Sequence, residues 1–293
     1  MWLVLDIIRL VTIFLTLVSG VTLNSYIVAV YVREWRRKKG FNVTDKIFLF
    51  RALTGIVYQC SCTVDNLIFL FVSLPSHNNG RNIYTFVFYI FLTYESIWNI
   101  AWVSLYYCLK LVKCSHCIFL QLKRRLSSSI TQILIISLVG LFFTTLPLHW
   151  TLHFHYNNVT NNPYGFHNSI EIDVRYVPLC MVLGSLLPFL ISFLCIGLSV
   201  KSLLSHVHQI RHHSSQFSSS PQLEGHLRAV RTMILQVCFC LALYLAVFSL
   251  LHLSPYLGLA VRIFIFIFIA SYPSSLAVIS IQGNPKLRKR PPT

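Results

Sequence analysis

The chain has 293 residues, of which 55% are hydrophobic and 11% charged, and its 24 basic and 8 acidic residues give a formal net charge of +16. This composition argues against a nucleic-acid-binding protein, because the basic residues are divided among short segments instead of gathering on one soluble surface. Anionic lipid headgroups and a protein partner explain the charge better.

Seven apolar runs divide the chain, each about 20 residues or longer and therefore long enough to cross a bilayer as a helix. Lipid admits only helices or closed barrels, and these runs lack the alternation of a barrel strand. We therefore predict an all-α membrane protein with a single seven-helix domain over residues 1–293. The expected spans are residues 10–32, 47–74, 83–109, 130–152, 176–200, 233–252 and 257–281.

The basic residues fall almost entirely in alternate gaps between these runs. Most of them lie in the gaps 33–46, 110–125 and 201–231 and in the tail after residue 281. Because basic loops stay in the cytoplasm, we expect the N-terminus outside and the C-terminus in the cytoplasm. The sequon at Asn158 then lies in the longest outer loop and is a candidate glycosylation site, whereas the sequon at Asn42 is cytoplasmic.

The second run contains two ionisable residues, Arg51 and Asp65. Charged groups within the bilayer are costly, so each needs an interior partner or water. Asp65 is expected near the outer mouth, where with Asn66 it either lines an outward-facing cavity or is solvated at the headgroup level. Arg51, in the inner third, is expected to be a structural or switch contact.

The third run carries a polar and aromatic stripe in its outer half, formed by Tyr89, Thr93 and Tyr94 at near-helical spacing. Such a stripe suits a small hydrophobic ligand or ordinary core packing, and both readings stay open. Glu95 lies near the membrane centre and must face the bundle, either as the floor of a pocket or as a tie between helices.

Prolines interrupt two of the later runs. Pro188 lies midway along the fifth run and Pro273 lies in the seventh. Each removes a backbone hydrogen bond and should kink its helix. A kinked helix facing a cavity can pivot, or the kink can be static, and the prolines alone do not decide between the two.

Several short motifs resemble, in the right order, those of the bitter taste receptors, the type 2 taste receptor family. The end of the third run, Tyr107-Cys108-Leu109-Lys110, and the following Phe119-Leu120-Gln121-Leu122-Lys123 are the most specific of them. The other matching blocks are Gly20/Asn24/Ile27, Trp35 with Asp45, Ser185–Phe189, Ser202/Leu203/His206, His226–Val230, Tyr272–Ser274 and Gly283–Arg288.

The chain departs from that family at two places. Gly55 stands where the family has an arginine in its second helix, and Arg51 lies one turn earlier on the same face. Arg51 could supply a similar guanidinium to a displaced partner such as Asn24 or a carbonyl of the last helix. In the seventh run Leu276-Ala277 replaces a His-Ser pair, so two contacts that help set the resting state are missing.

The resemblance implies a plasma-membrane G-protein-coupled receptor that binds small bitter compounds and activates a gustducin-type heterotrimeric G protein. The implied ligand residues lie in the outer halves of the spans: Asp65, Asn66, Tyr89, Thr93, Tyr94, Met181, Ser185, Tyr244, Phe248 and Phe266. The residues expected to contact the G protein form a basic ring at the inner end: Tyr107, Lys110, His206, His226, Arg228 and Arg231. The expected switch or structural residues are Asn24, Arg51, Glu95, Pro188 and Pro273.

Other functions fit less well. A vomeronasal pheromone-type receptor is the alternative among receptors, and the blocks at His226 and Gly283–Arg288 favour the taste family over it. A channel or transporter would need polar residues aligned through the membrane. Cys114-Ser115-His116-Cys117 lacks a second ligand pair at zinc spacing. No catalytic constellation is evident, so we expect neither an enzyme nor a cofactor nor a metal, and no nucleic-acid partner.

Overall fold

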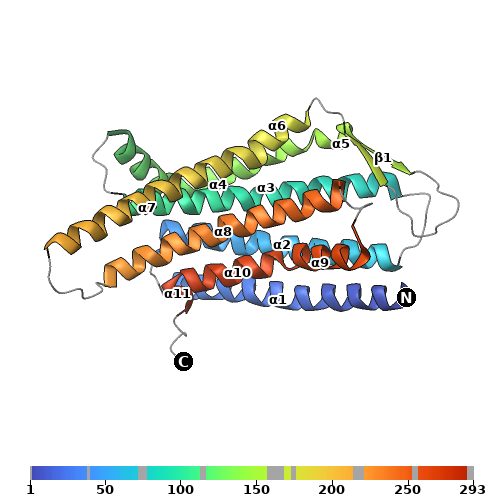
Figure 1. The fold of residues 1–293 in the computed structure, drawn as a ribbon, viewed down its shortest axis with the longest axis horizontal. Coiled ribbons are helices and arrows are strands. Elements are labelled where there is room, and N and C mark those ends of the chain that lie inside the picture. Colours follow the sequence, from blue (N-terminus) through green and yellow to red (C-terminus); the bar gives the residue numbers. More distant parts are fainter. Residues whose placement is uncertain are drawn as a thin grey trace.

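The structure, a computed structural model, describes residues 2–37, 40–71, 78–112, 117–156, 168–172, 176–213, 221–252 and 257–288. Helices running along one common axis build an elongated bundle (Figure 1). The long helices are α1 (Trp2–Arg36), α2 (Val43–Phe71), α3 (Asn78–Leu111), α4 (Cys117–Thr145), α7 (Leu187–His213) and α8 (Pro221–His252).

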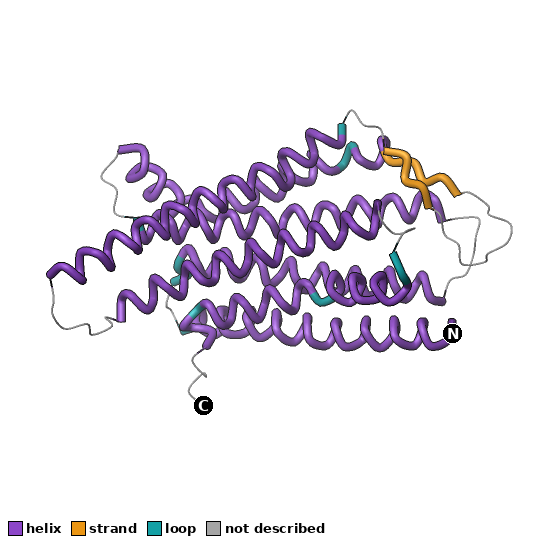
Figure 2. Tube along the Cα trace, viewed as in Figure 1, coloured by secondary structure: helices purple, strands orange, loops and turns teal. Residues whose placement is uncertain are grey.

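Shorter elements connect the long helices and complete the chain. Between α4 and α7 lie α5 (Leu148–Thr151), β1 (Leu152–Tyr156), β2 (Asn168–Ile172), α6 (Val177–Met181) and the π-helix η1 (Val182–Leu186). After α8 come α9 (Leu259–Ala270), α10 (Tyr272–Gly283) and α11 (Pro285–Arg288). The strands lie at the end of the bundle where α1 begins, and α11 lies at the other end (Figure 2).

Six helices of the described chain are long and apolar enough to cross a membrane, and α9 with α10 makes a seventh span if the bent pair crosses as one. The distribution of side chains is that of a membrane protein. Phe264 and Leu194 are 70% and 68% exposed, whereas Glu95, Asn99 and Gln236 are almost fully buried. Lipid solvates the apolar exterior, and the polar groups face inward because the hydrocarbon offers them no hydrogen bonds.

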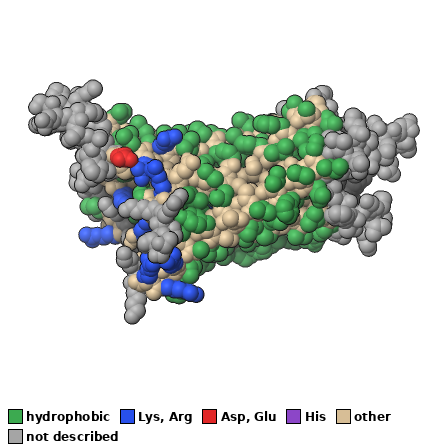
Figure 3. Space-filling model, turned by 90° about the horizontal axis from the view of Figure 1, so that it is seen from below, with side chains coloured by type: hydrophobic (Ala, Val, Ile, Leu, Met, Phe, Trp, Pro, Cys, Tyr) green, Lys and Arg blue, Asp and Glu red, His purple; other side chains and the backbone are tan. Residues whose placement is uncertain are grey.

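Basic side chains gather at the end of the bundle that carries α11, and apolar side chains cover its middle (Figure 3). This end includes the last turn of α1, with Arg33 and Arg36, and α11 with Lys286 and Arg288. The segregation of charge that the sequence pattern indicated is therefore present in three dimensions.

Both expected proline interruptions appear, in different forms. Helices α9 and α10 meet at a bend of 49°, and Pro273 stands in the first turn of α10, where its missing N–H costs least. Before Pro188 the helix widens into η1, in which the N–H of Leu187 bonds to the carbonyl of Val182. A π-helical turn is a common way to accommodate a disrupted hydrogen-bond ladder.

The fourth expected span, residues 130–152, overlaps the candidate membrane span Ser128–Trp150, and only its last two residues fall outside it. Helix α4 ends at Thr145, and Leu152 already belongs to β1. Pro147, which the sequence analysis passed over, ends the helix because the residue before a proline is disfavoured in helical conformation. The two strands, inside a segment taken as a loop, pair antiparallel from Leu152↔Ile172 to Tyr156↔Asn168.

Candidate functional site

Helix α3 occupies the centre of the arrangement and packs against α2, α4, α7 and α8. Its polar residues therefore face neighbouring helices over most of its length. Tyr94, Glu95 and Asn99 are each buried, while Tyr89 and Thr93 are half-buried. The outer stripe expected from the sequence thus lies within the bundle.

Arg9 of α1 joins two of the candidate ligand residues. Its Nη2 donates to Oδ1 of Asn66 at 3.0 Å, and its guanidinium lies 5.3 Å from the ring centroid of Phe266. A cation over an aromatic face is attracted by the ring's quadrupole. Arg9 was not predicted as a site residue, although a lone charge near the start of an apolar run already indicates a need for an interior partner.

A second group of candidates belongs to a tyrosine cluster between α2, α3 and α10. The ring centroid of Tyr58 lies 5.9 Å from that of Tyr89 and 6.2 Å from that of Tyr272. Thr93 is a hydrogen-bonding neighbour of the Tyr58 hydroxyl, and Asp65 interacts electrostatically with Tyr89. Tyr58 was not predicted, and Tyr272 was noted only as part of the Tyr272–Ser274 motif, because single aromatic residues in apolar runs look like core.

A third group surrounds Tyr94. Its ring packs directly against Gly184 in η1, so closely that a Cβ on that residue would overlap the ring. Tyr244 of α8 is a further electrostatic neighbour of the Tyr94 hydroxyl. Ser185 is buried, and its hydroxyl donates to the carbonyl of Met181 at 2.8 Å.

Two candidates are more exposed than the others. The exposed fractions of Met181 and Phe248 are 40% and 45%. The other candidate ligand residues fall into three groups. The group around Arg9 links α1, α2 and α9, and the group around Tyr94 links α3, η1 and α8. The tyrosine cluster lies between α2, α3 and α10.

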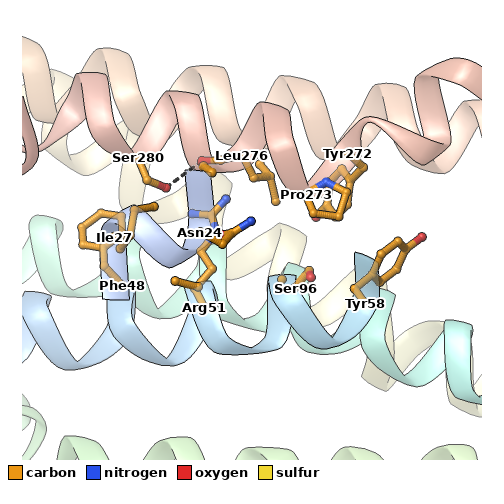
Figure 4. Close-up of a pocket in the computed structure, with 13 residues that line it drawn as sticks. Asn24, Ile27, Phe48, Arg51, Tyr58, Ser96, Tyr272, Pro273, Leu276 and Ser280 are labelled. Atoms are coloured by element: carbon orange, nitrogen blue, oxygen red, sulfur yellow. Dashed lines mark hydrogen bonds between the residues drawn. The ribbon is translucent and has the colours of Figure 1, made fainter. Parts of the chain in front are cut away.

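A small internal cavity of about 20 Å³ lies between α1, α2, α3 and α10 (Figure 4). It has room for about one water molecule. Three of the five expected switch residues, Asn24, Arg51 and Pro273, line it. Leu276 and Ala277 form part of its α10 wall and present no hydrogen-bonding side chain to it.

Arg51 is only 6% exposed, and its three guanidinium nitrogens have no hydrogen-bond partner among the described residues. The direct contact with Asn24 that the sequence analysis considered is not made. Nδ2 of Asn24 donates instead to the carbonyl of Gly20 at 2.8 Å. The amide of Asn24 lies against Gly55, one turn further along α2, which explains why it does not meet Arg51.

Glu95 is 2% exposed and faces α2, where Thr54 and Arg51 are its electrostatic neighbours. Oε1 accepts a hydrogen bond from the amide of Asn99, one turn further along α3. The described structure therefore gives Glu95 a hydrogen bond within its own helix and electrostatic contacts with α2. Both expected roles, pocket floor and tie, stay predictions.

At the basic end, Tyr107 packs on an apolar cluster that joins α3, α7 and α8 and includes Leu203 and Met233. Lys110 and Arg231 are exposed, and Arg228 forms an ion pair of 2.7 Å with Glu224. The side chains of His206 and His226 lie outside the described ones. The Tyr107 motif thus sits where three helices meet.

The segment after α10 is fastened to α1 and α2. Nζ of Lys286 lies 2.7 Å from Asp45 and 3.1 Å from Glu34. Nδ2 of Asn284 donates to the Tyr31 hydroxyl at 2.8 Å. Partial burial alone would lower the pKa of Lys286, but its hydrogen bonds to the two carboxylates outweigh this and raise that pKa above its ordinary value.

Two expectations fall on parts of the chain that the structure leaves out. Asn158 and residues 113–116 lie outside the described residues. Within the described residues, no group of three or more His, Cys, Asp or Glu side chains could hold a metal ion.

The fold is thus that of a multi-helix membrane protein, with an aromatic and polar interior towards one end and a basic surface at the other. A family model described as Taste receptor protein (TAS2R) matches residues 1–291. The chain therefore belongs to that family, which is one of multi-pass plasma-membrane receptors and not of enzymes.

Its relatives agree with this assignment. The chain is 29% identical to Taste receptor type 2 member 9 of Macaca mulatta, over 93% of this chain and 88% of the relative. It is 28% identical to Taste receptor type 2 member 4 of Rattus norvegicus, over 92% and 88%. It is 25% identical to Taste receptor type 2 member 39 of Homo sapiens, over 92% and 81%.

Proposed function

We propose that this chain is a bitter taste receptor that binds small, mostly hydrophobic compounds and activates a gustducin-type heterotrimeric G protein. The observation that carries the proposal is the family match over residues 1–291, nearly the whole chain. The single bundle of the described residues, with no separate soluble module among them, supports it. The vomeronasal and channel readings have no comparable support.

The ligand is proposed to enter from the end where α1 begins. The polar and aromatic groups around Asn66, Tyr89 and Tyr94 support this choice, because they supply a few hydrogen-bonding groups within an apolar wall. Arg9 joins the proposed ligand residues through its contacts with Asn66 and Phe266. Walls of this kind favour breadth of recognition over affinity.

The G protein is proposed to dock at the basic end, which must then face the cytoplasm. Tyr107 and Lys110 end α3 there, and α7 and α8 flank them. An agonist activates the receptor only by binding the coupling-competent conformer more tightly than the resting one, since equal affinity for both shifts nothing.

The test is a calcium-imaging screen of bitter compounds on cells that carry the receptor and a chimeric gustducin-type α subunit. We expect at least one compound to give a response that cells without the receptor lack. Tyr107→Ala or Lys110→Ala should then reduce the response while surface expression stays largely intact. Unchanged responses in both variants would remove the coupling role from this motif, and ion currents without any G protein would favour a channel instead.

A further inference from the structure

A groove of about 430 Å³ lies at the basic end between α8 and the junction of α10 with α11. Its rim carries three arginines, Arg228 and Arg231 from α8 and Arg288 from α11. Its wall continues along apolar side chains that include Leu235 and Ile279. The groove therefore combines a cationic mouth with an apolar side.

The groove is built into the helix packing. At its base α8 and α10 approach so closely that a Cβ on Gly283 would overlap the side chain of Thr232. Helix α10 ends at Gly283, and Asn284 turns the chain in extended conformation into α11. Helix α8 continues from Thr232 back to Pro221, beyond the end of α10 (Figure 1).

The charge of the mouth is only partly balanced. Arg228 is paired with Glu224 at 2.7 Å. Arg231 and Arg288 are exposed, and neither has an ion pair within the described parts of the chain. Two guanidinium groups facing one groove suit a phosphate group, which they can bind through paired hydrogen bonds.

The apolar side decides between possible occupants. Leu235 is 41% exposed on the outer face of α8, where acyl chains would surround it. An amphiphile with a phosphorylated head and acyl chains satisfies both parts of the groove, whereas a free anion would use the mouth alone. Basic pockets between membrane helices on the cytoplasmic side bind headgroups of this kind.

We propose that this groove binds an inositol phospholipid of the cytoplasmic leaflet, with the headgroup phosphates on Arg231 and Arg288 and the acyl chains along Leu235. The lipid would bridge α8 and α11 across the Gly283–Thr232 contact. The location in the cytoplasmic leaflet rests on the proposed function and its orientation, while the binding itself does not.

The test measures binding of dioctanoyl phosphatidylinositol 4,5-bisphosphate to the purified full-length receptor by native mass spectrometry. We expect binding at least tenfold tighter than that of dioctanoyl phosphatidylserine or of soluble inositol 1,4,5-trisphosphate. The double variant Arg231→Gln/Arg288→Gln should lose at least tenfold. The matched variant Arg36→Gln, which changes an exposed arginine at the same end but outside the groove, should bind as the parent does.

Equal losses in the double variant and in Arg36→Gln would overturn the site in favour of diffuse charge attraction. Equal binding of the soluble trisphosphate would overturn the lipid as occupant. A gustducin α-subunit peptide that loses binding in the double variant, while the lipid does not, would assign these arginines to G-protein docking. Because no agonist or G protein is present in the lipid assay, its failure is separate from failure of the calcium-imaging screen.

Discussion

Arg51 lines the internal cavity, and its guanidinium makes no hydrogen bond among the described residues. A buried charge without direct partners is costly, and the cavity holds about one water molecule that could offset part of the cost. The residue is therefore expected to lower the stability of the resting bundle.

Replacement of Arg51 by methionine, a similarly unbranched side chain, should raise the thermal stability of the detergent-purified receptor. The expected gain is about 1 kcal/mol, because apolar substitution removes the desolvation penalty of the guanidinium, which exceeds its attraction to the buried carboxyl of Glu95. The thermal midpoint measures it. Arg36→Met, on the exposed end of α1, should change stability by less than about 0.5 kcal/mol. A lowered midpoint for Arg51→Met would show that the guanidinium has a stabilising partner.

For single residues, the sequence predicted which side chains are unusual for a membrane span but not which residues they contact. Arg51, Asp65 and Glu95 stand out because charges are rare in apolar runs. Their partners depend on the rotation of each helix, which the sequence does not reveal. Asn24 faces Gly55 instead of Arg51 for this reason, and the Arg9–Phe266 contact joins positions far apart in the chain.

Among the elements, η1 and the helix that follows it show how local irregularity positions a side chain. The widened turn brings Gly184 against the ring of Tyr94, and the absence of a Cβ is what allows this contact. Pro188 predicted an irregularity in this span, but the type of turn follows from packing against α3. The end of α4 at Thr145, by contrast, follows from a local sequence signal, Pro147.

Gly184→Ala should destabilise the receptor by about 1–3 kcal/mol, because the added methyl group overlaps the Tyr94 ring and forces it to move. Gly197→Ala is the matched control in α7, since a Cβ there meets no atom within 4 Å. That substitution should be neutral or stabilising, as alanine favours helix over glycine. Equal stability of the two variants would contradict the close packing of the Tyr94 ring against Gly184.

The ion pairs of Lys286 fasten α11 to α1 and α2, and they should respond to pH in one direction. Because this lysine's pKa is raised in the folded state, its contribution to stability is complete below the ordinary lysine pKa of about 10.4 and is lost as the pH rises through the higher folded value.

The thermal midpoint of the parent should therefore exceed that of Lys286→Met by a constant amount between about pH 6 and 9 and should lose that advantage only above about pH 10.4. Glu224→Gln, which removes the exposed pair with Arg228, serves as the control and should change the midpoint little at neutral pH. A difference that vanishes between about pH 6 and 8 would mean that another group governs the attachment.

At the scale of the whole molecule, the two ends of the bundle differ in chemistry, and the proposals for ligand, G protein and lipid all depend on this difference. Apolar side chains cover its middle and basic ones gather at the α11 end (Figure 3). Tyrosines such as Tyr58 and Tyr89 pack in the interior towards the other end. The sequence predicted this arrangement well, because membrane spans and the placement of basic loops are one-dimensional patterns. Docking of a G protein, and the location of the bound inositol lipid in the cytoplasmic leaflet, both require the basic end to face the cytoplasm.

Epitope accessibility on intact cells measures that orientation directly. With a tag either at Met1 or at Thr293 of the full chain, antibodies should label the Met1 tag on intact cells and the Thr293 tag only after permeabilisation. Labelling of the Thr293 tag on intact cells would place the basic end outside, and the account of ligand entry and G-protein coupling would be contradicted with it.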